Sequence, residues 1–144
     1  MIAVDTPLLV YAHRADSPHH ERARAALRDL VMGRRAWAIP WPCLHEFLGV
    51  VTHPRIFEPP TSMSLALATV NRLLAQSRVD PLAETADHAT VLAGLLTRSD
   101  VVGPKVHDAR IAAICLAHGV NELWTADRDF SYFPQLRTHN PLVA

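Results

Sequence analysis

Acidic residues in this chain stand where buried strands meet loops, positions at which a carboxylate is hard to explain by structure alone. Asp5 follows the apolar run 2–4, and Asp127 follows a second apolar run over 123–126. If both runs are parallel strands, their carboxyl ends lie at one edge of the sheet, where α/β proteins hold their reactive groups. We therefore expect the two carboxylates to share that edge.

Two further acids occupy predicted helices. Glu46 lies in an otherwise apolar helical stretch, roughly opposite the residues that would pack inward. Asp108 opens a helix whose body, residues 109–117, carries Arg110 as its only charge, and Asp129 lies just beyond the second strand. Carboxylates that converge on one point repel each other, and a divalent cation among them removes that repulsion.

Histidines offer a different metal chemistry, because His45 precedes Glu46 and His107 precedes Asp108. Adjacent residues on a helix point about 100° apart, so neither pair readily binds one ion together. The segment 45–49 also lacks the second histidine of the zinc motif HExxH. Carboxylates without thiolates or paired histidines favour Mg²⁺ or Mn²⁺. Such an ion suits phosphodiester hydrolysis, since it binds a non-bridging oxygen and activates a water.

Each acid also has a purely structural explanation, and these alternatives stay open here. Asp108 could cap its own helix, and Asp127 or Asp129 could order a turn through bonds to the backbone. Glu46 could be a solvated charge on a helix face. Asp5 is the hardest to explain in this way, because it ends a strand beside the core. The metal-site hypothesis therefore depends on the whole set.

Length and composition fit a single domain over residues 1–144, with 49% hydrophobic and 19% charged residues. No apolar run approaches the roughly 20 residues of a membrane span, and the amino terminus lacks secretory features, so we expect a cytoplasmic protein. Cys43 and Cys115 lack CxxC spacing and lie in predicted apolar helices, which favours buried thiols. The formal net charge is zero, so no long-range basic field indicates a nucleic-acid partner.

Short apolar strands alternate with helical patterns, which predicts a mostly parallel α/β sheet of four or five strands. The strands are expected at residues 2–5, 36–39, 79–82, 123–126 and 136–138. Helices are expected around 8–11, from Pro18 to Gly33, from Trp41 to Pro54, after Ser62, from Thr85 or Asp87 to Leu96, and at 108–118. Ser17 is predicted to cap the second of these helices, and Gly119 to end the last.

The order of the acids resembles that of the PIN domain. The resemblance rests on Asp5-Thr6 after a short strand, Glu46 in a helix, the stretch 107–113 and the segment 125–130, and it covers essentially the whole chain. It is strongest towards the VapC toxins of bacterial toxin–antitoxin pairs, particularly the mycobacterial ones. It implies a three-layer α/β/α sandwich with Mg²⁺ or Mn²⁺ in an acidic pocket, and endoribonuclease activity against structured RNA. It also implies a homodimer, silenced by a VapB-type antitoxin whose carboxyl-terminal segment wraps the toxin.

The same resemblance implies a role for each matching residue. The residues with catalytic roles in the metal site are Asp5, Glu46, Asp108 and Asp127. The metal ligands among them are Asp5, Asp108 and Asp127. Asp129 is an auxiliary acid, and Thr6 or Thr125 could hydrogen-bond a ligand carboxylate or a metal-bound water. One departure is Pro7, where many relatives carry an asparagine.

Two alternatives come from other functional classes. A signalling receiver domain also has an acidic Mg²⁺ pocket, but it accepts a phosphoryl group on an aspartate near mid-chain. This chain has no aspartate between Asp29 and Asp80. A catalytically inactive PIN-like module, which only binds RNA or a partner protein, is the stronger alternative, and Pro7 is the residue that favours it.

Overall fold

The computed structural model describes residues 1–143. Its five strands form one sheet in the order β3-β2-β1-β4-β5, and every neighbouring pair is parallel. The strands are β1 (Ile2–Val4), β2 (Trp37–Pro40), β3 (Val79–Leu82), β4 (Glu122–Trp124) and β5 (Arg137–His139). The predicted parallel sheet is confirmed.

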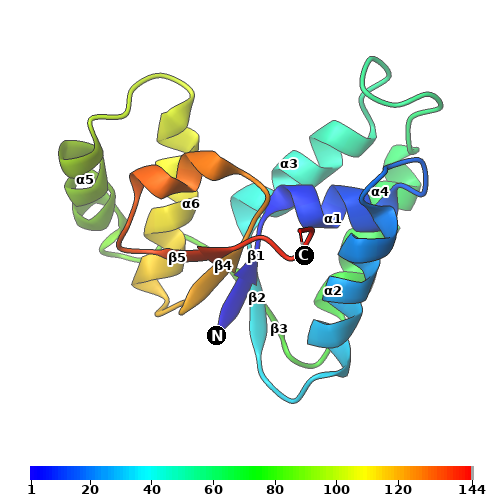
Figure 1. The fold of residues 1–144 in the computed structure, drawn as a ribbon, viewed down its shortest axis with the longest axis horizontal. Helices are drawn as coiled ribbons and strands as arrows, with labels where there is room; N and C mark the ends of the chain where they lie inside the picture. The colour runs from blue at the N-terminus through cyan, green and yellow to red at the C-terminus, as the bar shows by residue number, and fades with distance from the viewer. Residues whose placement is uncertain (144) are drawn as a thin grey trace.

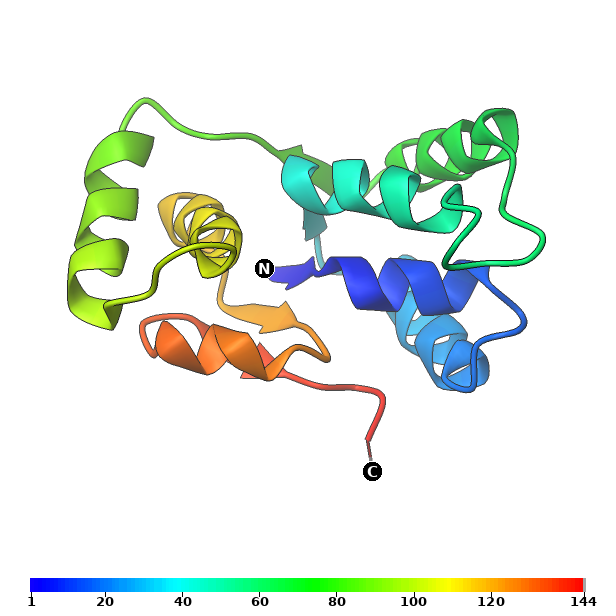
Figure 2. The same ribbon diagram turned by 90° about the horizontal axis from the view of Figure 1, so that it is seen from above.

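Helices cover both faces of this sheet. The helices are α1 (Thr6–His13), α2 (His20–Met32), α3 (Trp41–Val51), α4 (Met63–Leu74), α5 (His88–Ser99), α6 (Lys105–Ala117) and the 3-10 helix η1 (Arg128–Tyr132). Figure 2 shows α1 to α4 on one side of the sheet, and α5, α6 and η1 on the other. The chain therefore has the expected three-layer α/β/α architecture. Among the described residues, no helix is long and apolar enough to cross a membrane.

The core lies on both sides of the central strands. All of β2 is buried, as expected for a parallel strand with helices on each face. Phe47 of α3 and Ile114 of α6 are fully buried in the two helical layers. In α6 the run 111–115 is buried without a break, which fits the nearly all-apolar sequence of this helix. This buried run fixes the position of the first turn of α6, which lies at the edge of the core.

The strand order places β1 beside a reversal in the path of the chain. From β1 the chain proceeds to β2 and β3, and it then crosses back to β4 on the other side of β1. The register pairs Val4 with Trp124, so the ends of β1 and β4 lie side by side (Figure 1). In open parallel sheets, ligands bind at such a reversal, outside the carboxyl ends of the strands. Asp5 and Asp127 follow the two strands that border it.

Some helix boundaries differ from the predicted ones. The cap predicted at Ser17 is wrong, because residues 15–19 first fold into turns and α2 begins only at His20. The Ser17 hydroxyl instead accepts a hydrogen bond from the backbone N–H of His19, at 3.2 Å. Helix α6 begins earlier than predicted, at Lys105, so Asp108 lies within its first turn. The short turn expected around 8–11 is the complete helix α1.

Candidate functional site

Asp5 is a buried carboxylate held by two side chains from other elements. It directly follows β1 and is only 4% exposed. Its Oδ2 accepts a hydrogen bond from the Thr125 hydroxyl at 2.6 Å, and its Oδ1 accepts one from the Cys43 thiol at 3.4 Å. Burial raises the pKa of Asp5 above its ordinary value, although these hydrogen bonds act in the opposite direction. The surrounding protein therefore fixes this carboxylate in place while disfavouring its charge.

Thr125 joins the ends of the two strands at the reversal. Its buried hydroxyl donates to Asp5 and accepts from the backbone N–H of Asp127, at 3.0 Å. The backbone contributes a further link, since the N–H of Asp5 donates to the carbonyl of Trp124 at 3.0 Å. One hydroxyl thus sets the position of Asp5 relative to the loop that carries Asp127.

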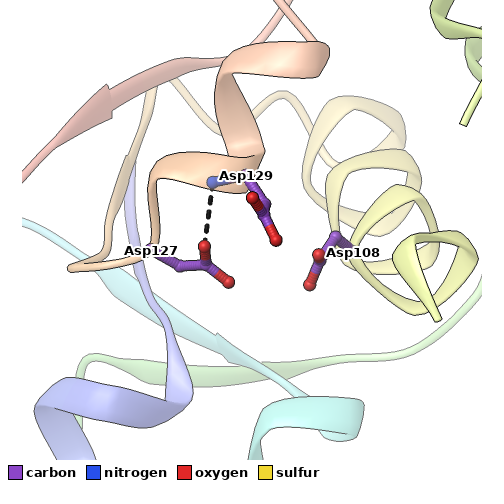
Figure 3. Close-up of side chains that lie close together, drawn as sticks. All are labelled: Asp108, Asp127 and Asp129. Atoms are coloured by element: carbon purple, nitrogen blue, oxygen red, sulfur yellow. Dashed lines mark hydrogen bonds between the residues drawn. The ribbon is translucent and has the colours of Figure 1, made fainter.

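Three carboxylates meet at this edge of the sheet. Asp108 comes from α6, Asp127 from the loop after β4, and Asp129 from η1, and one oxygen of each lies within 4.8 Å of the others. Figure 3 shows their side chains directed into one space. The backbone N–H of Asp129 donates to Oδ1 of Asp127 at 2.8 Å, so Asp127 also starts η1. Asp127 thus orders the turn into η1 and still contributes a carboxylate oxygen to the cluster.

The electrostatics of Asp108 identify a wider acidic region. Its pKa is raised to about 6, first by burial and then by the negative charges of four other acids. Those acids, in order of effect, are Asp127, Asp5, Asp129 and Glu46. All five carboxylates therefore act on the same small region. The helix-cap explanation of Asp108 is wrong, because Pro104 occupies the cap position and no side-chain cap bond forms.

This donor set fits a hard divalent cation. The three clustered groups are all carboxylates, and the described residues add no histidine or cysteine to them. Oxygen-only sites of this kind suit Mg²⁺ or Mn²⁺ rather than zinc. The only lysine of the chain, Lys105, lies near the cluster with its Nζ 4.1 Å from the centre of the Tyr132 ring. Its pKa is raised by a hydrogen bond to Tyr132 and by the charges of Asp129 and Asp108.

Glu46 lies at the rim of the acidic region and is exposed. Its Oε2 accepts a hydrogen bond from the Thr6 hydroxyl at 3.2 Å, which links α3 to the start of α1. Glu46 and Asp5 both lie outside the group of three close carboxylates. Pro7 is in the first turn of α1, where its missing N–H breaks no helical hydrogen bond. The structure thus brings Asp108, Asp127 and Asp129 closest, with the other acids around them.

Comparison with known proteins places this fold and site in a family. The sequence profile of the PIN domain matches residues 2–136. Ribonuclease VapC43 of Mycobacterium tuberculosis is 36% identical over 143 residues, covering 99% of this chain and 96% of that protein. The chain belongs to the PIN-domain VapC ribonucleases. Ribonuclease VapC33 of the same species is 32% identical over 142 residues, covering 99% of each chain.

Solved structures share the whole fold of this PIN domain. The VapBC2 complex of Rickettsia felis, bound to a promoter DNA fragment, has a TM-score of 0.71 at 21% identity and covers 97% of this chain and 98% of the other. Mycobacterium tuberculosis VapC20, described as a toxin that cleaves the sarcin–ricin loop, has a TM-score of 0.67 at 21% identity, covering 91% and 93%. At such identities these likenesses concern the fold.

Sequence reasoning missed two neighbours of the acidic site in this PIN domain. Cys43 was expected only as an inert buried thiol, and it is buried, but its Sγ contacts Asp5. No local pattern predicts that contact, because it joins residues of different elements. Lys105 lies outside the helix predicted at 108–118, whereas in the structure it opens α6 beside the clustered acids. The sequence offered one signal of a special role for Lys105, because it is the only lysine in the chain.

Proposed function

We propose that this chain is a metal-dependent endoribonuclease toxin that acts on RNA in the cytoplasm. The observation that carries the proposal is the group of three carboxylates at the sheet reversal, in a chain of the VapC ribonuclease family. Cation-binding carboxylates at such an edge suit phosphodiester hydrolysis, which needs no nucleophile from the protein when a water is activated.

The proposed roles follow from the position of each acid. Asp108, Asp127 and Asp129 are best placed to hold the cation, and Asp5 is the fourth candidate ligand. A bound Mg²⁺ or Mn²⁺ supplies the positive charge that hydrolysis of a phosphodiester requires. The Thr125 hydroxyl orients the Asp5 carboxylate, and the N–H of Asp129 orients that of Asp127. Glu46, fixed by Thr6, adds negative charge at the rim where RNA would enter.

The proposed partner is a VapB-type antitoxin, and the proposed assembly state is a homodimer. Structures of similar fold, from Rickettsia felis and nontypeable Haemophilus influenzae, are VapBC complexes. This chain also exposes large apolar side chains on α4 and at the end of α2. Those residues are Met63, Leu65, Leu67, Val31 and Met32. Exposed apolar surface of this kind supports coverage by another protein chain.

An RNA-cleavage assay tests the enzymatic proposal. We expect purified protein to cleave RNA with Mg²⁺ or Mn²⁺, to stop in EDTA, and to recover when metal is restored. Asp108→Asn should lower the rate at least about 100-fold, because the amide keeps the shape but loses the charge that holds the cation. Asp29→Asn, an exposed aspartate on α2, is the matched control and should cleave normally.

Two outcomes would contradict the proposal. Cleavage by Asp108→Asn at the wild-type rate would contradict the proposal that Asp108 holds the catalytic cation. A folded wild-type protein that binds RNA but never cleaves it, with either metal, would favour the inactive PIN-like module.

A further inference from the structure

Two histidines that the acidic site does not use lie together beside it. In the sequence His45 precedes Glu46 and His107 precedes Asp108, on helices far apart along the chain. In the structure both histidines line one cavity of about 180 Å³ between α3 and α6. Its complete lining is Pro42, His45, Glu46, His107, Arg110 and Ile111. The histidine of each pair thus lines the cavity, and the acid of each pair belongs to the acidic region. Glu46 belongs to both, because it lines the cavity and its charge also raises the pKa of Asp108.

The polar groups of this cavity are available to a ligand. His45 and His107 are exposed, and their imidazoles make no hydrogen bond within residues 1–143. The ring of His45 is stacked at a tilt against Trp41, with 5.8 Å between centroids, which orients one imidazole. Arg110 bonds Glu84 through Nε alone, so its two Nη groups keep their donors within the described chain. Two histidines and one arginine, with side-chain donors unbonded within residues 1–143, therefore line one small space.

Size and chemistry together indicate the occupant. A volume of about 180 Å³ is more than ten times the roughly 10–15 Å³ that a cavity needs to hold one water, so the cavity admits a larger ligand such as a planar heteroaromatic ring. Imidazole can both donate and accept hydrogen bonds, and the planes of histidine and arginine are surfaces on which unpaired RNA bases stack. An RNA strand lying across the acidic carboxyl edge would place a flanking base at this position.

We propose that the cavity between α3 and α6 binds the base of an RNA nucleotide adjacent to the scissile phosphodiester. In this arrangement His45 and His107 contact the base, and the free Nη groups of Arg110 donate to the base or to its phosphate. The inference rests on the proposed ribonuclease function and adds to it a determinant of nucleotide preference.

Cleavage kinetics on short RNAs test the cavity. The substrates are single-stranded oligonucleotides that differ at one position beside the cut, together with versions that lack the base there. His45→Ala and His107→Ala should each raise KM about tenfold with little change in kcat, as expected for loss of one stacked base. Both variants should also discriminate less than wild type between substrates that differ in the nucleotide beside the cut. On RNA without that base, wild type and variants should behave alike.

Matched controls separate a substrate contact from a structural effect. Glu84→Gln removes the negative charge beside Arg110 but keeps a hydrogen-bond acceptor and the guanidinium itself, so nucleotide preference should persist. Arg110→Met removes the guanidinium and should weaken binding. His53→Ala changes an exposed histidine in the loop after α3 and should leave the kinetics unchanged. Thermal melts confirm that each variant is folded.

The outcomes distinguish this inference from the proposed function. Unchanged KM and preference in both histidine variants, with active wild type, would overturn the cavity assignment. If wild type cleaves no RNA with Mg²⁺ or Mn²⁺, the proposed function fails. A measurement of RNA binding then tests separately whether the cavity holds a base. Fluorescence anisotropy with a labelled pentanucleotide and the Asp108→Asn protein would then support the cavity if the histidine substitutions weaken binding, and overturn it if they do not.

Discussion

Asp108 experiences most directly the repulsion within the acidic site. Burial and four neighbouring acids raise its pKa to about 6 from an ordinary value of 3.8. Without a cation the folded chain therefore holds this proton more tightly than the unfolded chain does. Between about pH 4 and pH 6 the folded state binds more protons, so its stability falls as the pH rises through that range. Asp5, whose pKa is also raised, contributes in the same direction.

Replacing Asp108 by asparagine should stabilise the metal-free protein at pH 7. The full shift corresponds to about 3 kcal/mol, and solvent screening at this half-buried side chain reduces the expected gain to about 1 kcal/mol. Urea unfolding in EDTA at pH 4 and pH 7 measures the free energy of unfolding of the variant and of wild type. The difference between the two should be present at pH 7 and vanish at pH 4. Excess Mg²⁺ should stabilise wild type and leave the variant nearly unchanged.

The opposite result has a clear meaning at the same scale. If Asp108→Asn is less stable than wild type in EDTA at pH 7, the carboxylate makes structural bonds that outweigh its repulsion. The acid would then be a structural residue, and the cation proposal would lose its electrostatic support.

At the scale of the element, α6 positions Asp108 and packs against η1, which carries Asp129. It runs through the core, and Gly119 lets the chain leave it towards β4 with a backbone φ of +71°. Residues with a Cβ adopt this left-handed conformation only at a cost. Gly94 is the natural comparison, because it lies inside α5 with ordinary helical geometry. A Cβ added at either position meets no other atom within 4 Å.

The two glycines should therefore respond to alanine with opposite signs. Gly119→Ala should destabilise the fold by about 1 kcal/mol, because only the backbone conformation opposes the new Cβ. Gly94→Ala should stabilise it by roughly 0.5–1 kcal/mol, since alanine loses less entropy in a helix interior. Thermal or urea unfolding of both variants gives the comparison. Equal effects of the two substitutions would show that the turn after α6 relaxes freely.

For the whole molecule, the placement of charge matters more than its sum. The formal net charge is zero, yet five carboxylates act on one region at the carboxyl edge of the sheet. A polyanion meets repulsion there until a cation is bound. This placement of charge fits the proposed contact with a single phosphodiester through a bound cation better than it fits long-range attraction of RNA.

Expression of the chain alone should arrest bacterial growth, and co-expression of the proposed VapB-type antitoxin should relieve the arrest. Asp108→Asn, at equal soluble level, should not arrest growth, because the proposed cleavage uses the metal site that this substitution removes. Asp29→Asn should arrest growth as wild type does. Colony counts after induction, with protein level measured by immunoblot, provide the readout. Normal growth with abundant folded wild-type protein would argue against a toxin.

The sequence by itself determined the parallel sheet and the edge at which Asp5 and Asp127 lie. Both results are local, because short apolar runs define strands and parallel strands end at the same edge. The order of the acids also indicated the PIN-domain family, which the profile match over residues 2–136 confirms. The strands and most helices were predicted without knowledge of packing. The cap predicted at Ser17 was wrong, because the chain makes further turns before α2 begins at His20.

Only the tertiary structure decided which acids come together. Asp129 joins Asp108 and Asp127 because η1 packs against α6, while Thr125 and Cys43 hold Asp5 outside that group. The sequence also could not predict that His45 and His107 line one cavity, since each lies on its own helix. Spacing along a sequence determines which face of one helix or strand a residue occupies. Distances of a few ångströms between elements depend on how those elements pack, and no local pattern encodes them.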